Sequence, residues 1–370
     1  MEIKFVSGLA DVIAAQTEIS SVDGKRGVLR YRGYGIEDLA DNSSFEEVCY
    51  LLLYGKLPTK AQLNGFKNKL KKEQKLSKPV QDFIKGSPKT SNPMDVLRTA
   101  VSIIGVYAKK ETLVDSSVRL IAKVPIIITA FGRVIQNKKI LQPKPKLSIA
   151  GNFLYMLNGK VSKLEEEIFD VCLILHAEHG MNASTFSARV AASTRTDIYS
   201  AITAAIATLK GPRHGGANEK VLEMVKEIKT EKNVESYIMK RLKKKVRIMG
   251  FGHRVYRIKD PRAYILEERS KELARKTKSN FYDILKKVEK IMEREVGHKG
   301  IWPNVDFFSG SVYNSLKIPP KLFTPIFALG RVPGWCAHLL EEYQPANRIM
   351  RPKAIYIGPK QRKYIPISKR

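Results

Sequence analysis

The chain has 370 residues, enough to bury a large core in one big domain or two unequal ones. Its 66 Lys and Arg against 36 Asp and Glu give a formal net charge of +30, which attracts polyanions and steers anionic ligands. The longest apolar run, 124–131, is far shorter than the ~20 residues that span a bilayer, and the first residues lack the order of a secretory signal, so we expect a cytoplasmic protein without a membrane partner.

In chain order, the first predicted element is a β-hairpin, because two short apolar runs between residues 19 and 31 flank Asp23-Gly24. Helical periodicity then dominates, with start signals at Ser44, at Pro58-Thr59 and at Asn92-Pro93. Further helices are expected at 118–134, 164–192, 197–210, 218–229, 235–245, 261–276, 281–296, from 303, at 322–329 and at 333–342. The last residues alternate at 354–357 and 364–367 and predict a short hairpin.

These elements predict an all-α protein with minor β-hairpins at both termini. Gly/Pro breaks near 211–216 and 317–320 bracket a charged helical segment. We therefore expect a smaller helical domain at 215–321, inserted into a discontinuous large domain formed by 1–214 and 322–370. The three cysteines, Cys49, Cys172 and Cys336, have no metal-like spacing and lie in apolar segments, which is typical of reduced core residues.

The most informative stretch is Gly250-Phe-Gly-His253-Arg-Val-Tyr-Arg-Ile-Lys-Asp260-Pro-Arg262. Its two glycines permit tight turns and close approach of a ligand, and Asp260 followed by proline is typical of a helix N-cap. Arg262 then lies in the first helical turn, where a cation opposes the helix dipole. That placement indicates an anion held between Arg262 and His253; a surface arginine and a loop histidine are the alternative.

Two further residues have a chemical and a structural interpretation. His214, before Gly215-Gly216, stands between a helix end and the next helix start, where a neutral ring is expected; it can donate a hydrogen bond to a developing enolate or serve as a turn cap. Asp306 stands at a helix start beside Phe307-Phe308, where burial would raise its pKa and the helix terminus would lower it. From sequence, a capping role and a catalytic base both remain open for Asp306.

The stretch 250–262 resembles the signature of the citrate synthase family, and the resemblance extends from Gly8 to Gly358. It implies a large and a small helical domain with a cleft between them. It assigns the enol-stabilising role to His214, in His-Gly-Gly, and the base that deprotonates the acetyl group of acetyl-CoA to Asp306, in Pro-Asn-Val-Asp. His253 would donate to the carbonyl oxygen of oxaloacetate.

The resemblance also implies binding residues. Oxaloacetate would contact His179, Arg262, Arg331 and Arg351, and because Arg351 comes from the second subunit in this family, a homodimer is implied. Coenzyme A would contact the backbone of Ile248, Met249, Gly250, Phe251 and Gly252, with Arg257 near phosphate. Acetyl-CoA is a substrate, so no cofactor and no metal are expected.

Several alternatives remain at this stage. His176 and His179, three apart on one predicted helix, lack the order of a zinc-protease motif, so His176 is expected to pack within the helix, and His298 and His338 to be structural or surface residues. Asn92 and Arg213 depart from the family pattern and leave 2-methylcitrate synthase, which uses propionyl-CoA, as an alternative. A basic nucleic-acid-binding protein is the alternative of another class, although no reader motif is present. The abundance of Lys, Glu and Arg also fits a thermophilic host.

Overall fold

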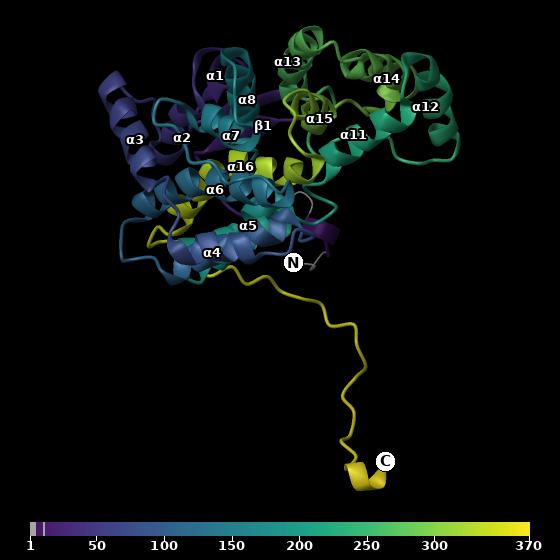
Figure 1. Cartoon of the computed structure of the whole chain (residues 1–370). Helices are drawn as coiled ribbons and strands as arrows, with labels where there is room; N and C mark the ends of the chain where they lie inside the picture. Colours follow the sequence, from purple (N-terminus) through teal and green to yellow (C-terminus); the bar gives the residue numbers. More distant parts are fainter. Residues whose placement is uncertain (1–4, 10–11) are drawn as a thin grey trace.

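The structure is a computed structural model that describes residues 5–9 and 12–370. Helices make up almost all of the regular secondary structure of the described chain (Figure 1), which confirms the predicted fold class. The first ten helices are α1 (Ile36–Asn42), α2 (Phe45–Tyr54), α3 (Lys60–Glu73), α4 (Lys78–Gly86), α5 (Pro93–Val106), α6 (Leu113–Ile135), α7 (Ile149–Asn158), α8 (Lys163–His176), α9 (Ala183–Ser193) and α10 (Ile198–Leu209). They are followed by α11 (Ala217–Ile228), α12 (Val234–Lys243), α13 (Pro261–Thr277), α14 (Phe281–Val296), α15 (Val305–Ser315) and α16 (Phe323–Glu342).

A small antiparallel sheet near the N-terminus confirms the first predicted hairpin. Its strands are β1 (Ser20–Asp23), β2 (Val28–Tyr31) and β3 (Tyr34–Gly35), in that order, with Ser20 opposite Tyr31. The hairpin tip rests on the chain just after His253: the backbone N–H of Arg257 donates to the carbonyl oxygen of Gly24 at 3.0 Å. A Cβ atom on Gly24 would lie 2.1 Å from the carbonyl oxygen of Val255, so this approach requires glycine.

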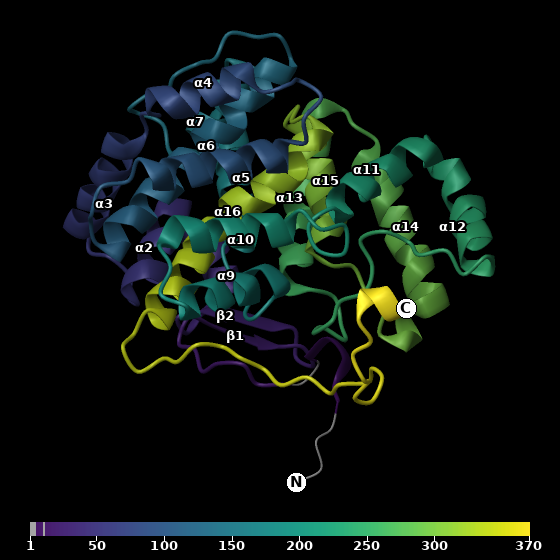
Figure 2. The same cartoon turned by 90° about the horizontal axis from the view of Figure 1, so that it is seen from below.

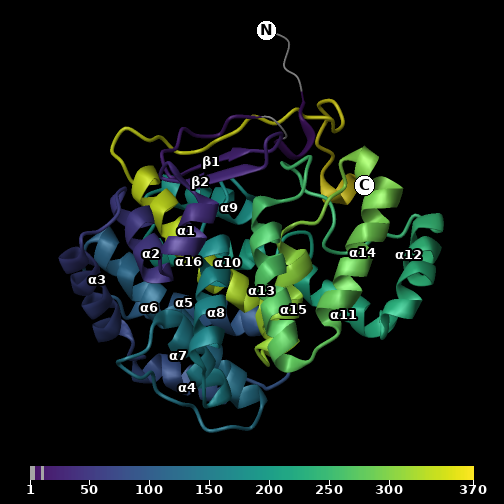
Figure 3. The same ribbon diagram turned by 90° about the horizontal axis from the view of Figure 1, so that it is seen from above.

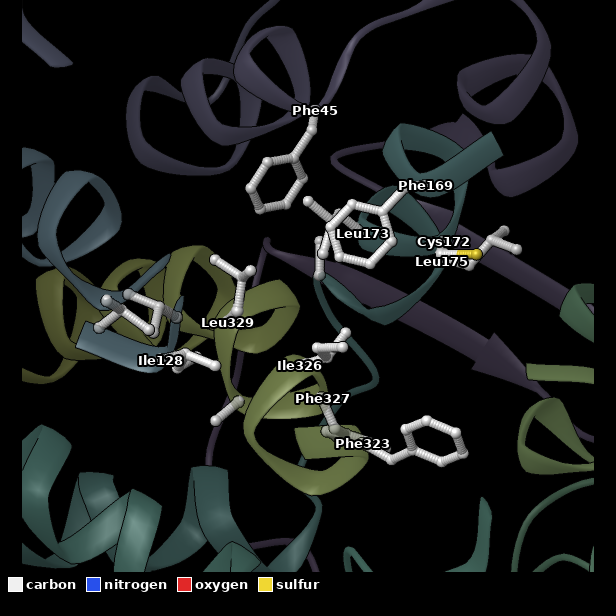
Figure 4. Close-up of a cluster of buried hydrophobic side chains, with 14 of the residues drawn as sticks. Phe45, Ile128, Phe169, Cys172, Leu173, Leu175, Phe323, Ile326, Phe327 and Leu329 are labelled. Carbon is white, nitrogen blue, oxygen red and sulfur yellow. The ribbon is translucent and has the colours of Figure 1, made fainter. Parts of the chain in front are cut away.

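Helix α16 forms the centre of the larger helical group. It packs on α2, α6, α8, α9 and α10, and Figure 4 shows its side chains Phe323, Ile326 and Leu329 among apolar residues of its neighbours, such as Phe169 of α8. Almost every residue of α16 is buried. The expectation of separate helices at 322–329 and 333–342 is wrong, because Pro333 lies inside this single helix. Packing on all sides outweighs the ~3 kcal/mol that an internal proline costs.

Helices α11 to α15 gather at one side of the molecule (Figures 1 and 3). Within this group α11 and α13 pack on α15, and α12 packs on α14. Its contacts with the remaining helices run mainly through α13, which touches α1 and α8, and α11, which touches α16. The division into domains at 215 and 321 stays a prediction.

The segment after α8 corrects the expectation of one helix over 164–192. Helix α8 ends at His176 and α9 begins at Ala183. Gly180 has a left-handed φ of 59°, and the Asn182 side chain accepts a hydrogen bond from the backbone N–H of Thr185 at 3.1 Å, which caps α9. His179 therefore lies in a loop rather than on a helix face with His176.

The C-terminal segment beyond α16 corrects the second predicted hairpin. Residues 344–366 form no strand, and the chain extends away from the helical body (Figure 1) until a short 3₁₀ turn at Ile367–Lys369. In the view from below, this segment crosses in front of the body (Figure 2). Its alternating apolar side chains are exposed to solvent, and for Ile357 the exposed fraction is 94%. The alternation fails as a hairpin signal because the single chain offers these side chains no surface to cover.

The cysteines and the most apolar helices bear on two further expectations from the sequence. Cys49, Cys172 and Cys336 are free and buried, which confirms their place in the core. In the described ranges, no helix combines the length and the apolar character needed to cross a bilayer.

Candidate active site

The backbone around Gly252, in the stretch 250–262, brings the segments that carry His253 and Asp306 together. The N–H of Gly252 donates to the carbonyl of Trp302 at 2.9 Å, and the N–H of Asn304 donates to the carbonyl of Gly250 at 2.9 Å. Gly250 has a φ of 79°, and a Cβ atom there would lie 2.9 Å from the Cα of Phe307. This close pairing places the loop that carries His253 beside the start of α15, which carries Asp306.

His253 has a defined tautomer. Its Nδ1 accepts hydrogen bonds from the backbone N–H groups of Val255, at 3.0 Å, and Tyr256, at 3.1 Å. The ring proton therefore sits on Nε2. Burial, and then the charge of Arg262, lower the pKa of His253 to about 4, so the ring is a neutral donor at neutral pH.

His179 faces His253 from the loop between α8 and α9. The two ring centroids are 5.1 Å apart in an edge-to-face arrangement. The Nε2 atom of His179 is 3.2 Å from the hydroxyl of Tyr256. Burial, then Arg262 and the neighbouring His253, hold the pKa of His179 well below its usual value, so this ring is also neutral.

His214 lies in the turn between α10 and α11. Its Nε2 accepts from the backbone N–H of Ser184 at 3.3 Å and lies 2.9 Å from the Ser184 hydroxyl, which also accepts from the indole N–H of Trp335. The proton of a neutral ring is then on Nδ1. Burial, followed by Arg331, lowers the pKa of His214 to about 4. A neutral ring agrees with the expectation for His214, and the neighbouring Arg213 is exposed and is not among the groups that lower its pKa.

Asp306 occupies the first turn of α15 without capping it. The cap is Asn304, whose side chain accepts from the N–H of Asp306 at 3.0 Å. Burial raises the pKa of Asp306 to about 6, against a lowering effect of Arg262. One carboxylate oxygen, Oδ1, is buried with no hydrogen-bond partner among the described residues. Burial therefore outweighs the helix terminus, and the carboxylate is free to take a proton.

Two buried arginines connect these groups. Arg262 pairs with Asp260, and Arg331 donates from Nε to the carbonyl of His176 at 2.6 Å while its guanidinium lies over the ring of Phe327. The charge of Arg262 acts on the pKa of His253, and that of Arg331 acts on the pKa of His214. Both act on His179 and Asp306. The two arginine charges thus couple the six predicted side chains. Three of them lie close together, because His179 faces His253 and the His253 loop pairs with the start of the helix that carries Asp306.

Arg351 lies apart from this group. It is exposed in the C-terminal segment of the same chain, well beyond the end of α16. Its assignment to the site of a second subunit stays a prediction.

A pocket of about 510 Å³ opens next to His253. Of the residues predicted to bind coenzyme A, Ile248, Phe251 and Gly252 line it. Met249, Gly250 and Arg257 do not, and the exposed Arg257 contacts the hairpin tip through its backbone. Three basic residues also line the pocket: Lys245, Arg247 and Arg254. Lys245 and Arg247 belong to a run rich in Lys and Arg, residues 240–247, that precedes the stretch 250–262.

The remaining histidines lie outside the site. His176 is buried, and its Nδ1 is 2.7 Å from the carbonyl of Cys172 within α8. His338 is buried between Glu178 and Arg189, while His298 is exposed. Over residues 5–9 and 12–370, no three His, Cys, Asp or Glu side chains gather as a metal site would require. The absence of a metal cofactor stays an expectation.

Sequence reasoning missed several residues that orient the site. Ser184 and Trp335 fix the ring of His214, Tyr256 contacts both other histidines, and Asp260 holds Arg262. Only Asp260 carried a signal, as a helix cap. The others act through contacts between segments far apart in the chain, which local patterns do not reveal.

The sequence was compared with known families and proteins. The family described as "Citrate synthase, C-terminal domain" matches residues 8–353. A citrate synthase from Synechocystis sp. is 48% identical, over 99% of this chain and 94% of that protein. A 2-methylcitrate synthase from Shewanella oneidensis is 42% identical, over 98% of both chains.

The fold was compared with solved structures. The ternary complex of carboxymethyl coenzyme A and oxaloacetate with citrate synthase from Thermoplasma acidophilum matches with a TM-score of 0.94 and 38% identity. The match covers 99% of this chain and 100% of that one. A citrate synthase from Thermotoga maritima matches with a TM-score of 0.90, 40% identity and coverage of 98% and 99%.

Proposed function

Because the chain belongs to the citrate synthase family, we propose that it is an acyltransferase that condenses acetyl-CoA with oxaloacetate and hydrolyses citryl-CoA to citrate and CoA. One observation supports this most directly. Asp306, an unpartnered carboxylate with a pKa raised to about 6, shares a site with two neutral histidines whose free ring N–H groups are of opposite tautomers. A base next to two neutral donors suits enolisation and attack on a second carbonyl.

The first step forms the enolate of acetyl-CoA. Asp306 takes a proton from the methyl group of acetyl-CoA, and the electron pair of that C–H bond moves into the thioester carbonyl. His214 donates from Nδ1 to the thioester oxygen where negative charge develops. A neutral imidazole stabilises this charge without a full proton transfer, and burial strengthens the interaction because water is excluded.

The second step joins the carbons. The methylene carbon of this enolate attacks the ketone carbon of oxaloacetate, and His253 donates a hydrogen bond from Nε2 to the ketone oxygen as negative charge develops there. The proton that Asp306 removed from the methyl group balances this charge, so the oxygen ends as the hydroxyl of citryl-CoA and Asp306 is ionised again. Water then cleaves the thioester of citryl-CoA, which yields citrate and CoA. These steps are carried by side chains of the chain itself, and acetyl-CoA enters as a substrate.

Oxaloacetate is a dianion and needs fixed cations. We assign its binding to His179, Arg262 and Arg331, together with Arg351 from a second subunit of a homodimer. Arginine suits this role because its planar fork matches a carboxylate with two hydrogen bonds. Burial lowers the pKa of Arg331 only to about 10, so it remains charged at neutral pH.

Coenzyme A would occupy the pocket beside His253. Ile248, Phe251 and Gly252 supply its apolar and backbone wall, and Lys245, Arg247 and Arg254 supply positive charge for phosphate groups. Closure of helices α11 to α15 over bound oxaloacetate would exclude water before the thioester arrives. This division into two mobile domains is part of the proposal, as is a location in the cytoplasm.

A second candidate activity, 2-methylcitrate synthase, is favoured by the 42% identity with the Shewanella oneidensis enzyme of that name. One methyl group is worth only about 1–3 kcal/mol of discrimination, so both acyl groups can be accepted by one pocket. The deciding experiment supplies oxaloacetate with acetyl-CoA or propionyl-CoA and compares kcat/KM. A higher value with acetyl-CoA supports citrate synthase, and a higher value with propionyl-CoA reverses the assignment. No turnover with either rejects the proposed function.

A further inference from the structure

We propose that Tyr256 is a positioning residue that fixes the rings of His179 and His253 relative to each other, so that both address one oxaloacetate molecule. This inference rests on the proposed function and adds a residue with no assigned role. Tyr256 is not expected to touch the reacting atoms. It acts through the two histidines.

Tyr256 contacts His253 through its backbone and its ring, and it contacts His179 through its hydroxyl. Its backbone N–H donates to Nδ1 of His253 at 3.1 Å, and the two ring centroids are 4.7 Å apart. Its hydroxyl lies 3.2 Å from Nε2 of His179, with ring centroids 5.5 Å apart. Because the histidine rings are themselves 5.1 Å apart, the three rings form one compact cluster.

The direction of the hydrogen bond between the Tyr256 hydroxyl and Nε2 of His179 follows from which of the two groups carries the proton. Tyr256 is only 1% exposed, and among the described residues Nε2 of His179 is the one acceptor within hydrogen-bond distance of its hydroxyl. A buried hydroxyl donates to an available acceptor, since an unpaired buried donor is costly. Burial also raises the pKa of Tyr256, which keeps the phenol protonated. Tyr256 therefore donates, and His179 carries its proton on Nδ1.

The same residue thus selects complementary tautomers in its two neighbours. His179 is protonated on Nδ1 because the Tyr256 hydroxyl occupies Nε2. His253 is protonated on Nε2 because the Tyr256 backbone, together with that of Val255, occupies Nδ1. If Tyr256 only filled space in the core, its replacement by phenylalanine would not change the binding of oxaloacetate. The hydroxyl group therefore distinguishes a positioning role from a purely structural one, because phenylalanine lacks only that group.

The test compares Tyr256→Phe with Tyr264→Phe, a matched loss of a hydroxyl at a residue that is 57% exposed. Loss of the Tyr256 hydroxyl leaves Nε2 of His179 buried without a donor, so KM for oxaloacetate should rise about 5-fold to 100-fold. KM for acetyl-CoA should change by less than about 2-fold, and Tyr264→Phe should match the wild type. An unchanged KM for oxaloacetate in Tyr256→Phe overturns the inference.

A second readout does not depend on turnover. Nitrogen NMR of labelled histidine separates the Nδ1–H and Nε2–H tautomers, and the His179 signals can be assigned by their loss in His179→Gln. The wild type should show His179 as Nδ1–H, and Tyr256→Phe should shift it toward Nε2–H. An Nε2–H tautomer in the wild type overturns the inference even if Tyr256→Phe fails to fold. A wild type inactive with both acyl-CoA substrates instead rejects the proposed function, while the tautomer remains measurable.

Discussion

The carboxylate of Asp260 and the guanidinium of Arg262 form a two-point ion pair at the start of α13. The distances are 3.0 Å from Nε to Oδ1 and 2.7 Å from Nη2 to Oδ2, and both side chains are buried. Nη1 of Arg262 has no hydrogen bond among the described residues, so it remains available to a substrate carboxylate. Asp260 thus holds in place an arginine that would otherwise be a buried, unpaired cation.

Replacement of Asp260 by asparagine should destabilise the protein. Asparagine can still cap α13, but it removes the charge that pairs with Arg262, and breaking a buried pair costs about 3–5 kcal/mol. Denaturant unfolding measures the change, and KM for oxaloacetate should rise with it. The matched control is Asp197→Asn, an exposed cap of α10, which should change stability by less than about 0.5 kcal/mol. Equal effects of the two substitutions would contradict the role of the ion pair.

Asp306→Asn should separate catalysis from stability. It removes the base, so turnover should fall by at least about 100-fold. It also removes a buried charge: the pKa of Asp306 is raised from 3.8 to about 6, so the ionised form is disfavoured in the folded state. The variant should therefore gain about 1–3 kcal/mol of unfolding free energy at pH 8.

The pH dependence of that gain provides the control. The penalty on the wild-type carboxylate is fully present above pH 6 and disappears as the pH falls toward 3.8, because the group is then protonated in both states. Thermal unfolding of both proteins at pH 8 and near pH 4 measures the difference. A variant that is no more stable at pH 8 than the wild type would show that Asp306 is not strained by burial.

The pH profile of activity should have one acid limb near pH 6. Asp306 must be ionised to act as a base, so kcat/KM should fall about tenfold per pH unit below its pKa of about 6. His214 and His253 have pKa values lowered to about 4, so they stay neutral donors through this range. Initial rates between pH 5 and 9 test this. A limb at or above about pH 6.5, where an ordinary histidine titrates, would contradict the neutral assignment.

Gly24→Ala should impair activity from a position in the N-terminal hairpin. The added Cβ would lie 2.1 Å from the carbonyl oxygen of Val255, two residues after His253, so the hairpin tip or the histidine loop must move. We expect a loss of about 1–3 kcal/mol in stability and a lower kcat/KM. Gly65→Ala is the control, since nothing lies within 4 Å of its Cβ position in α3, and it should be neutral or stabilising. A fully active Gly24→Ala would show that the hairpin does not support the loop.

Much of the site could be predicted because its residues stand in short, distinctive sequence motifs. His214, His253 and Asp306 each occur beside glycine or at a helix start, and the structure pairs the His253 loop with the start of the helix that carries Asp306. What could not be predicted is the balance of opposing effects on each group. For Asp306, burial raises the pKa and the charge of Arg262 lowers it, and only the packing around the carboxylate decides the outcome.

The errors in the predicted fold have a related origin. The break after His176 was signalled by Gly180 and Asn182, but apolar residues on either side concealed it. The sequence predicts a helix boundary at Pro333, yet this proline lies within the almost fully buried helix α16, where tertiary contacts override local preference. The alternation of apolar residues near the C-terminus predicts a hairpin that does not form. A period of two residues does not reveal whether other parts of the chain can pack on the apolar face.

The burial of Cys49, Cys172 and Cys336 has a practical consequence. Burial raises the pKa of Cys49, and likewise that of Cys172 and Cys336, so none of the three forms a reactive thiolate on the folded surface. A disulfide reagent added during turnover would therefore react with the thiol of released coenzyme A and leave the native protein unmodified. Slow consumption of the same reagent in the absence of substrate would then report unfolding.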